Sequence, residues 1–123
     1  MRALVIDDSR AVRAFIRPIL REMSLDVVEA GNGREGLDRL REFPDTGLVL
    51  VDWNMPVMDG LEFIQTVRAN RANDTVRIVM VTTETESEQM SRAMAAGANE
   101  YVMKPFTKGV LVAKLSLLDV FGE

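Results

Sequence analysis

Residues 49–60 read Val49-Leu50-Val51-Asp52-Trp53-Asn54-Met55-Pro56-Val57-Met58-Asp59-Gly60, and this stretch decides the fold. The apolar run 49–51 is typical of a strand that is buried on both faces of a parallel sheet. Asp52 ends that strand, so we expect its carboxylate at the C-terminal edge of the sheet, in a loop that faces solvent. Open α/β sheets bind their ligands at that edge.

Three further strand-like runs also end in side chains that can do chemistry. They are residues 3–6 before Asp7 and Asp8, residues 78–81 before Thr82, and residues 101–103 before Lys104. Because the carboxyl ends of parallel strands share one edge, we expect these acids, the hydroxyl and the lysine to gather there. Such a group predicts a site for phosphoryl transfer.

Strands and helices alternate five times along the chain. A fifth strand is expected at 26–30. Helices are expected after the N-caps Ser9, Asp59 and Thr107, through Leu37 and Leu40 to Pro44, and over 86–96 before Gly97. The first helix carries one apolar stripe made by Val12, Phe15, Ile16, Ile19, Leu20 and Met23, and the last runs to about Phe121.

This alternation predicts an α/β fold with a parallel sheet and helices on both faces. Right-handed crossovers favour a flavodoxin-like (βα)5 three-layer sandwich with strand order 2-1-3-4-5. That order places Asp7 and Asp8 beside Asp52. We expect one domain over residues 1–123, with no output domain and no linker.

Composition excludes several classes of function. The net charge is −4 with no basic run, so we expect no nucleic-acid binding by this domain alone. There is no apolar stretch of membrane length and no signal-peptide pattern, so a cytoplasmic protein is expected. The chain has no cysteine and no histidine, which excludes thiol chemistry and an imidazole base. Any histidine in the pathway belongs to a partner.

The ordered set of motifs resembles the receiver domain of two-component response regulators, in particular the single-domain CheY-like chemotaxis regulators. The resemblance covers essentially the whole chain. It is carried by Asp7-Asp8, Asp52, Met55-Pro56 with Asp59-Gly60, Val81-Thr82, and Tyr101-Val102-Met103-Lys104-Pro105-Phe106.

The resemblance implies a signalling phosphoacceptor that promotes only its own phosphorylation and dephosphorylation, and is not otherwise an enzyme. Asp52 would take a phosphoryl group from the phosphohistidine of a CheA-like sensor kinase. Asp8 and Asp52 would bind Mg²⁺ directly, Asp7 through water, and Asn54 through its backbone carbonyl. Lys104 and Thr82 would each bind a phosphoryl oxygen.

The resemblance also implies a switch and a readout face. Thr82 would move toward the phosphoryl group, and the ring of Tyr101 would turn inward from an exposed rotamer. The readout face would be the fourth helix, the fifth strand and the fifth helix, presented to a flagellar switch protein. We expect a monomer, with a dimer through the last helix as the alternative, and a phosphatase as a further partner.

Apolar residues on the last two helices support such a face. Leu111, Leu115 and Leu118 can face the sheet, which leaves Val110, Ala113 and Leu117 partly outside. Met90 and Met94 either extend this surface or belong to the core of the fourth helix.

One position and one short segment depart from the family pattern, and two positions match it. Thr83 stands where a small residue is usual, so its bulk is expected to slow access to the site. Residues 108–110 (Lys-Gly-Val) lack the acids of the chemotaxis members, which leaves the partner open. Asn54 and Glu84 match those members and indicate a short-lived phosphorylated state.

Two alternatives remain. A haloacid-dehalogenase-like Mg²⁺ phosphatase also uses a strand-end aspartate, but needs a second acid two residues later, where this chain has Asn54. A flavodoxin-like module that binds flavin or only a protein partner would not require Asp8, Asp52 and Lys104 together.

Overall fold

The computed structural model describes residues 1–83 and 87–118, and its sheet has the predicted topology. All strand pairs are parallel, and the order is β2-β1-β3-β4-β5. The strands are β1 (Arg2–Ile6), β2 (Asp26–Ala30), β3 (Thr46–Val51), β4 (Arg77–Thr82) and β5 (Glu100–Met103). The flavodoxin-like α/β fold is therefore confirmed.

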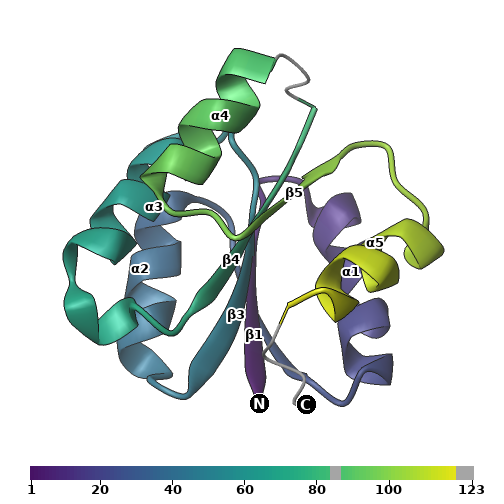
Figure 1. Cartoon of the computed structure of the whole chain (residues 1–123). Helices are drawn as coiled ribbons and strands as arrows, with labels where there is room; N and C mark the ends of the chain where they lie inside the picture. The colour runs from purple at the N-terminus through teal and green to yellow at the C-terminus, as the bar shows by residue number, and fades with distance from the viewer. Residues whose placement is uncertain (84–86, 119–123) are drawn as a thin grey trace.

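Helices cover both faces of this sheet (Figure 1). They are α1 (Arg10–Glu22), α2 (Gly33–Glu42), α3 (Gly60–Ala69), α4 (Ser87–Ala96) and α5 (Lys108–Ser116). Helices α1 and α5 lie on one side, and α2, α3 and α4 lie on the other. The 3₁₀ turn η1 (Arg71–Asn73) occupies the polar loop after α3.

Each face has its own apolar core, which fixes the sheet between two helical layers. Ile16 and Leu20 of α1 and Leu111 and Leu115 of α5 are buried in one core. Phe63 of α3 is buried in the other. The residues of the three central strands, β1, β3 and β4, alternate between the two cores and are almost all buried, as expected for a parallel sheet covered on both sides.

The predicted helix starts are confirmed by their caps. The side chains of Ser9, Asp59 and Thr107 accept hydrogen bonds from the backbone N–H groups of Val12, Glu62 and Val110. Helix α4 ends before Gly97, whose φ of 121° is available to glycine at little cost. Among the described residues, no helix is long and apolar enough to cross a membrane.

Two details of the helices differ from the sequence prediction. Phe15 does not join the buried stripe of α1, because its side chain turns outward to Phe106 and is 48% exposed. Helix α5 ends at Ser116, not near Phe121, because the N–H groups of Leu117 and Leu118 bond to carbonyls three residues back and tighten the last turn. Phe121 itself lies outside the described residues.

Candidate functional site

The sheet register brings the first two predicted site segments together. Ile6 is paired with Val51, so Asp7 and Asp52 follow neighbouring strands at the same level. The N–H of Asp52 donates to the carbonyl of Ile6 at 3.0 Å, which extends the pairing by one residue. Two residues far apart in the chain thus lie side by side at the C-terminal edge of the sheet.

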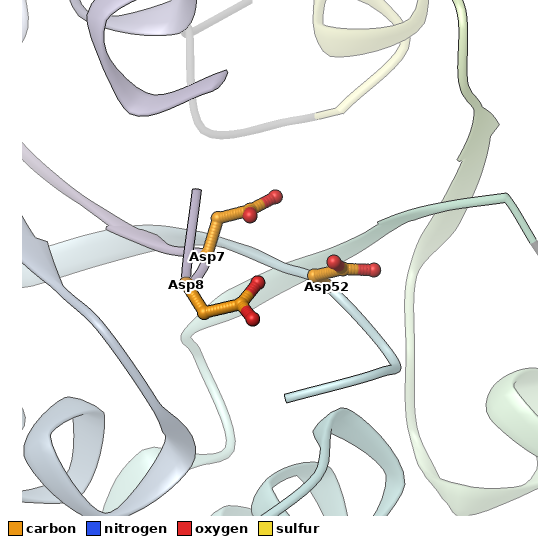
Figure 2. A group of neighbouring side chains, drawn as sticks. All are labelled: Asp7, Asp8 and Asp52. Carbon is orange, nitrogen blue, oxygen red and sulfur yellow. The ribbon is translucent and has the colours of Figure 1, made fainter. Parts of the chain in front are cut away.

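The carboxylates of Asp7, Asp8 and Asp52 form one cluster. Each offers an oxygen, and these oxygens lie within 4.8 Å of one another. Figure 2 shows the three side chains projecting from the ends of β1 and β3. Asp7 and Asp52 are buried and Asp8 is exposed. Oxygen ligands at this spacing fit a hard cation such as Mg²⁺, which needs few protein ligands because it keeps several waters.

Lys104 provides the positive charge of the site. Its Nζ donates to Asp7 Oδ2 at 2.7 Å and to Asp52 Oδ2 at 3.2 Å. Lys104 follows β5 directly and is tied to the end of β4, because its N–H donates to the carbonyl of Thr82 at 2.9 Å. Two acids can therefore share a buried edge, since one ammonium group pairs with both.

The pKa values of this pair follow from their surroundings. Burial raises the pKa of Asp52, Lys104 lowers it and Asp7 raises it again, and the net direction is upward. Burial lowers the pKa of Lys104, but hydrogen bonding and attraction to Asp7 and Asp52 outweigh this, so its pKa is raised. Lys104 is therefore charged over the whole neutral range, while ionised Asp52 is less favourable than it would be in water.

Asp52 is fixed in place, and its side chain keeps a small exposure to solvent. Its Oδ1 accepts a hydrogen bond from the N–H of Trp53 at 2.7 Å, and its side chain keeps 10% of its exposure. The side chain of Thr82, which is fully buried, also hydrogen-bonds to the Asp52 carboxyl group and lowers its pKa. The exposed part of the Asp52 carboxylate is therefore a point where a small group from solvent can meet a carboxylate that Thr82 and Lys104 both contact.

Asn54 lies in the loop that follows Asp52 and is exposed. Its place as a carbonyl ligand stays a prediction. Thr83 is exposed and lines an apolar groove of about 460 Å³ next to Lys104; Phe15, Pro105 and Phe106 are among its other walls. Glu84, which the sequence also placed beside the site, lies outside the described residues.

The structure corrects the expected starting position of Tyr101. Its ring is only 5% exposed and belongs to the core on the α3 and α4 side, with Met80 and Ala98 in the same cluster. The exposed rotamer was expected only from the resemblance to CheY-like receivers. The apolar cluster beneath α4 instead accommodates the ring.

Gly60 and Arg13 also belong to the site, although neither was expected to contact a site residue. A Cβ on Gly60 would lie 2.2 Å from the carbonyl oxygen of Asp52, so the loop can close on the strand only with glycine here. The Asp59-Gly60 pair in the sequence was a signal for this close approach. Arg13 Nη1 donates to the carbonyl oxygen of Asp7, a contact that no local pattern indicates.

Comparison with known proteins gives the family. The sequence pattern of the response regulator receiver domain matches residues 3–116. The chain belongs to the response regulator receiver family. It is 42% identical to a chemotaxis protein CheY homolog of Campylobacter jejuni, over 99% of this chain and 93% of that protein.

Other relatives agree with this result. Chemotaxis protein CheY1 of Helicobacter pylori (strain J99) is 40% identical over 96% of each chain. The structure of chemotaxis response regulator CheY4 of Vibrio cholerae matches with a TM-score of 0.88 and 33% identity, over 94% of this chain and 96% of that chain. This receiver is therefore similar to chemotaxis CheY proteins in both sequence and fold.

Proposed function

We propose that this receiver accepts a phosphoryl group on Asp52 from the phosphohistidine of a CheA-like sensor kinase. The observation that carries the proposal is the position of the Asp52 carboxylate, which keeps a small exposure to solvent, lies beside those of Asp7 and Asp8, and is 3.2 Å from the ammonium group of Lys104. A nucleophile, a cation-binding cluster and a fixed positive charge therefore meet at one point. We assign residues 1–123 to one receiver domain.

In this proposal Asp8 and Asp52 would hold Mg²⁺ directly, Asp7 would hold it through water, and Asn54 would add its backbone carbonyl. Mg²⁺ supplies charge neutralisation for the carboxylates and the phosphoryl oxygens. An Asp52 oxygen attacks the phosphorus in line, the new O–P bond forms, and the N–P bond breaks with its electron pair returning to the donor imidazole. Lys104 moves its hydrogen bonds from the carboxylates to a phosphoryl oxygen, and the Thr82 hydroxyl binds another.

The signal would then be read from the face formed by α4, β5 and α5. The exposed apolar side chains there are Met94 at 45%, Met103 at 45%, Val110 at 47% and Leu117 at 74%. Met90 is half-buried against the core, so it supports the helix rather than the surface. A partner such as a flagellar switch protein would cover this apolar surface.

Thr82 and Tyr101 would couple the site to this face. Thr82 bonds to Asp52 now and would follow the phosphoryl group afterwards, and Tyr101 lies two residues from exposed Met103 on β5. Because the ring is already buried, phosphorylation would stabilise the inward arrangement rather than create it. Ligand binding of this kind shifts a population between two packings.

The test is the mass of the intact protein after incubation with acetyl phosphate and Mg²⁺. We expect one phosphoryl adduct on the wild type, none on Asp52→Asn and none when the metal is chelated. Asp59→Asn is the matched control, because Asp59 caps α3 and asparagine is an equally good cap. An adduct of equal yield on Asp52→Asn would refute the proposal, as would a wild type that stays unmodified.

A further inference from the structure

The loop that carries the acidic pair is held from the side by an arginine of α1. Arg13 Nη1 donates to the backbone carbonyl oxygen of Asp7, and its Nε donates to Glu29 Oε1 at 3.0 Å. The side chain of Arg13 is only 16% exposed, and Glu29 comes from the edge strand β2. One guanidinium group therefore connects the loop of Asp7 and Asp8 to Glu29, which lies sixteen residues after Arg13 in sequence.

The hydrogen bond from Arg13 to the Asp7 carbonyl affects the orientation of the Asp8 side chain more than that of the Asp7 side chain. The Asp7 carboxylate is fixed by its own bonds, from the N–H of Ser9 at 2.9 Å and from Lys104 at 2.7 Å. The Asp7 carbonyl belongs to the peptide group that joins Asp7 to Asp8, so its direction sets where the Asp8 side chain leaves the backbone. Asp8 is exposed, so its backbone direction matters most for bringing its carboxylate to the cluster.

An arginine next to a cation site is unfavourable unless its charge is balanced, and Glu29 balances it. Its second oxygen accepts a hydrogen bond from Arg17 Nη1, so one carboxylate serves two arginines. Burial raises the pKa of Glu29, but the hydrogen bonds and charges of Arg17 and Arg13 outweigh burial and lower it. Glu29 is thus ionised at neutral pH, and Arg13 can donate to the loop while its charge is compensated.

We propose that Arg13, held by Glu29, is a positioning residue for magnesium binding, acting through the Asp7–Asp8 peptide group on the Asp8 carboxylate. This inference rests on the proposed function, since it concerns the same metal site. Groups that orient metal ligands without touching the metal typically change metal affinity 10- to 100-fold when they are removed.

The experiment is a Mg²⁺ titration of the whole chain. Binding is measured by calorimetry and, independently, by the change in fluorescence of Trp53. Trp53 is the one tryptophan of the sequence and follows Asp52 directly. Arg13→Gln removes a positive charge near the site, so charge alone would tighten Mg²⁺ binding. Loss of positioning would instead weaken Mg²⁺ binding, and we expect the affinity of Arg13→Gln for Mg²⁺ to be about tenfold lower than that of the wild type.

Arg17→Gln is the matched control. It removes the same charge from the same carboxylate one helical turn further on, and the contact recorded for Arg17 is with Glu29, not with the Asp7 carbonyl. We expect its Mg²⁺ affinity to stay within about twofold of wild type, because no ligand is reoriented. Arg13→Lys keeps the charge but replaces the fork of donors with one ammonium group, so its Mg²⁺ binding should also weaken.

Melting temperatures of all variants, measured in chelator, show whether a substitution destabilises the fold apart from any effect on Mg²⁺ binding. If Arg13→Gln does not fold, Arg13→Lys carries the test. Mg²⁺ binding by the Arg13 variants as tight as wild type, or tighter, would overturn the inference, and so would equal weakening in Arg17→Gln. The proposed function fails differently: the wild type itself would show no Mg²⁺ binding or no adduct on Asp52.

Discussion

Replacing Lys104 by methionine removes the only positive charge recorded in contact with the two buried carboxylates of the described site. Lys104 bonds to Asp7 at 2.7 Å and to Asp52 at 3.2 Å, and its side chain is 17% exposed. Methionine has a similar length and no charge. The substitution therefore leaves the packing of the side chain nearly unchanged and leaves two acids facing each other.

The cost follows from the burial of the pair. Breaking a buried ion pair by removing one partner typically costs 3–5 kcal/mol. The Asp52 side chain keeps 10% of its exposure, so we take the lower end, about 3 kcal/mol. For a domain of this size about 1 kcal/mol corresponds to roughly 4 °C, so Lys104→Met should melt about 12 °C below wild type in chelator at neutral pH.

The pH dependence has a definite sign. The folded-state pKa of Asp52 is already raised, mainly by burial, and removing Lys104 takes away the charge that opposes this rise. A raised carboxyl pKa favours folding below the unfolded-state value, about 3.9, and that advantage is lost as the pH rises through the folded-state value. The deficit of Lys104→Met should therefore shrink in acid and grow toward neutral pH.

The assay is thermal unfolding in chelator and then in Mg²⁺. Mg²⁺ at a hundredfold excess over its dissociation constant adds about 2.7 kcal/mol to the free energy of unfolding. Lys104→Met in Mg²⁺ should therefore be nearly as stable as the wild type in chelator. Lys108→Met is the control, since its exposed pair with Glu22 is expected to contribute less than about 1 kcal/mol. If Lys104→Met melted as close to wild type as Lys108→Met does, Lys104 would not be the counter-ion of the site.

Four further substitutions test the fold around the site and the orientation of α5. Val57 has a φ of 71° and is 81% exposed, so Val57→Asn should relieve strain and stabilise the protein by about 1 kcal/mol in urea unfolding; no gain would contradict this. Gly60→Ala should cost about 1–3 kcal/mol and slow formation of the acetyl phosphate adduct, because its Cβ would meet the Asp52 carbonyl; a normal rate would show that the loop adapts. Leu117→Asp should change stability by less than about 0.5 kcal/mol. Leu111→Ala should cost about 2–5 kcal/mol, because Leu111 is fully buried whereas Leu117 is exposed. Equal losses of stability in Leu117→Asp and Leu111→Ala would mean that α5 presents a different face to the sheet.

The fold and the centre of the site were predictable because they depend on pattern and topology. Apolar runs without alternation indicated a parallel sheet, and strand order then fixed Asp7 beside Asp52. Lys104 was expected at the site beside the acids, and the structure pairs it with the carboxylates of Asp7 and Asp52. Each of these residues stands at the end of a strand, so its place follows from the sheet itself.

What the sequence did not reveal depends on tertiary packing. The burial of Tyr101 is decided by the cluster beneath α4, and the outward turn of Phe15 by the ring of Phe106, whose centroid lies 5.7 Å away. Arg13 lies on α1 and its carboxylate partner Glu29 on β2, so the local sequence around either residue does not predict the contact. Such contacts become visible only when the helices are placed on the sheet.

The most direct test of the central claim is to locate the phosphoryl group. Borohydride reduces an acyl phosphate to an alcohol, so a phosphorylated aspartate becomes homoserine and can be found by peptide mass spectrometry. After incubation with acetyl phosphate and Mg²⁺, we predict homoserine at position 52 alone. Homoserine at position 7 or 8 instead, or a phosphoryl group that resists reduction because it sits on a hydroxyl such as that of Thr82 or Thr83, would contradict the account.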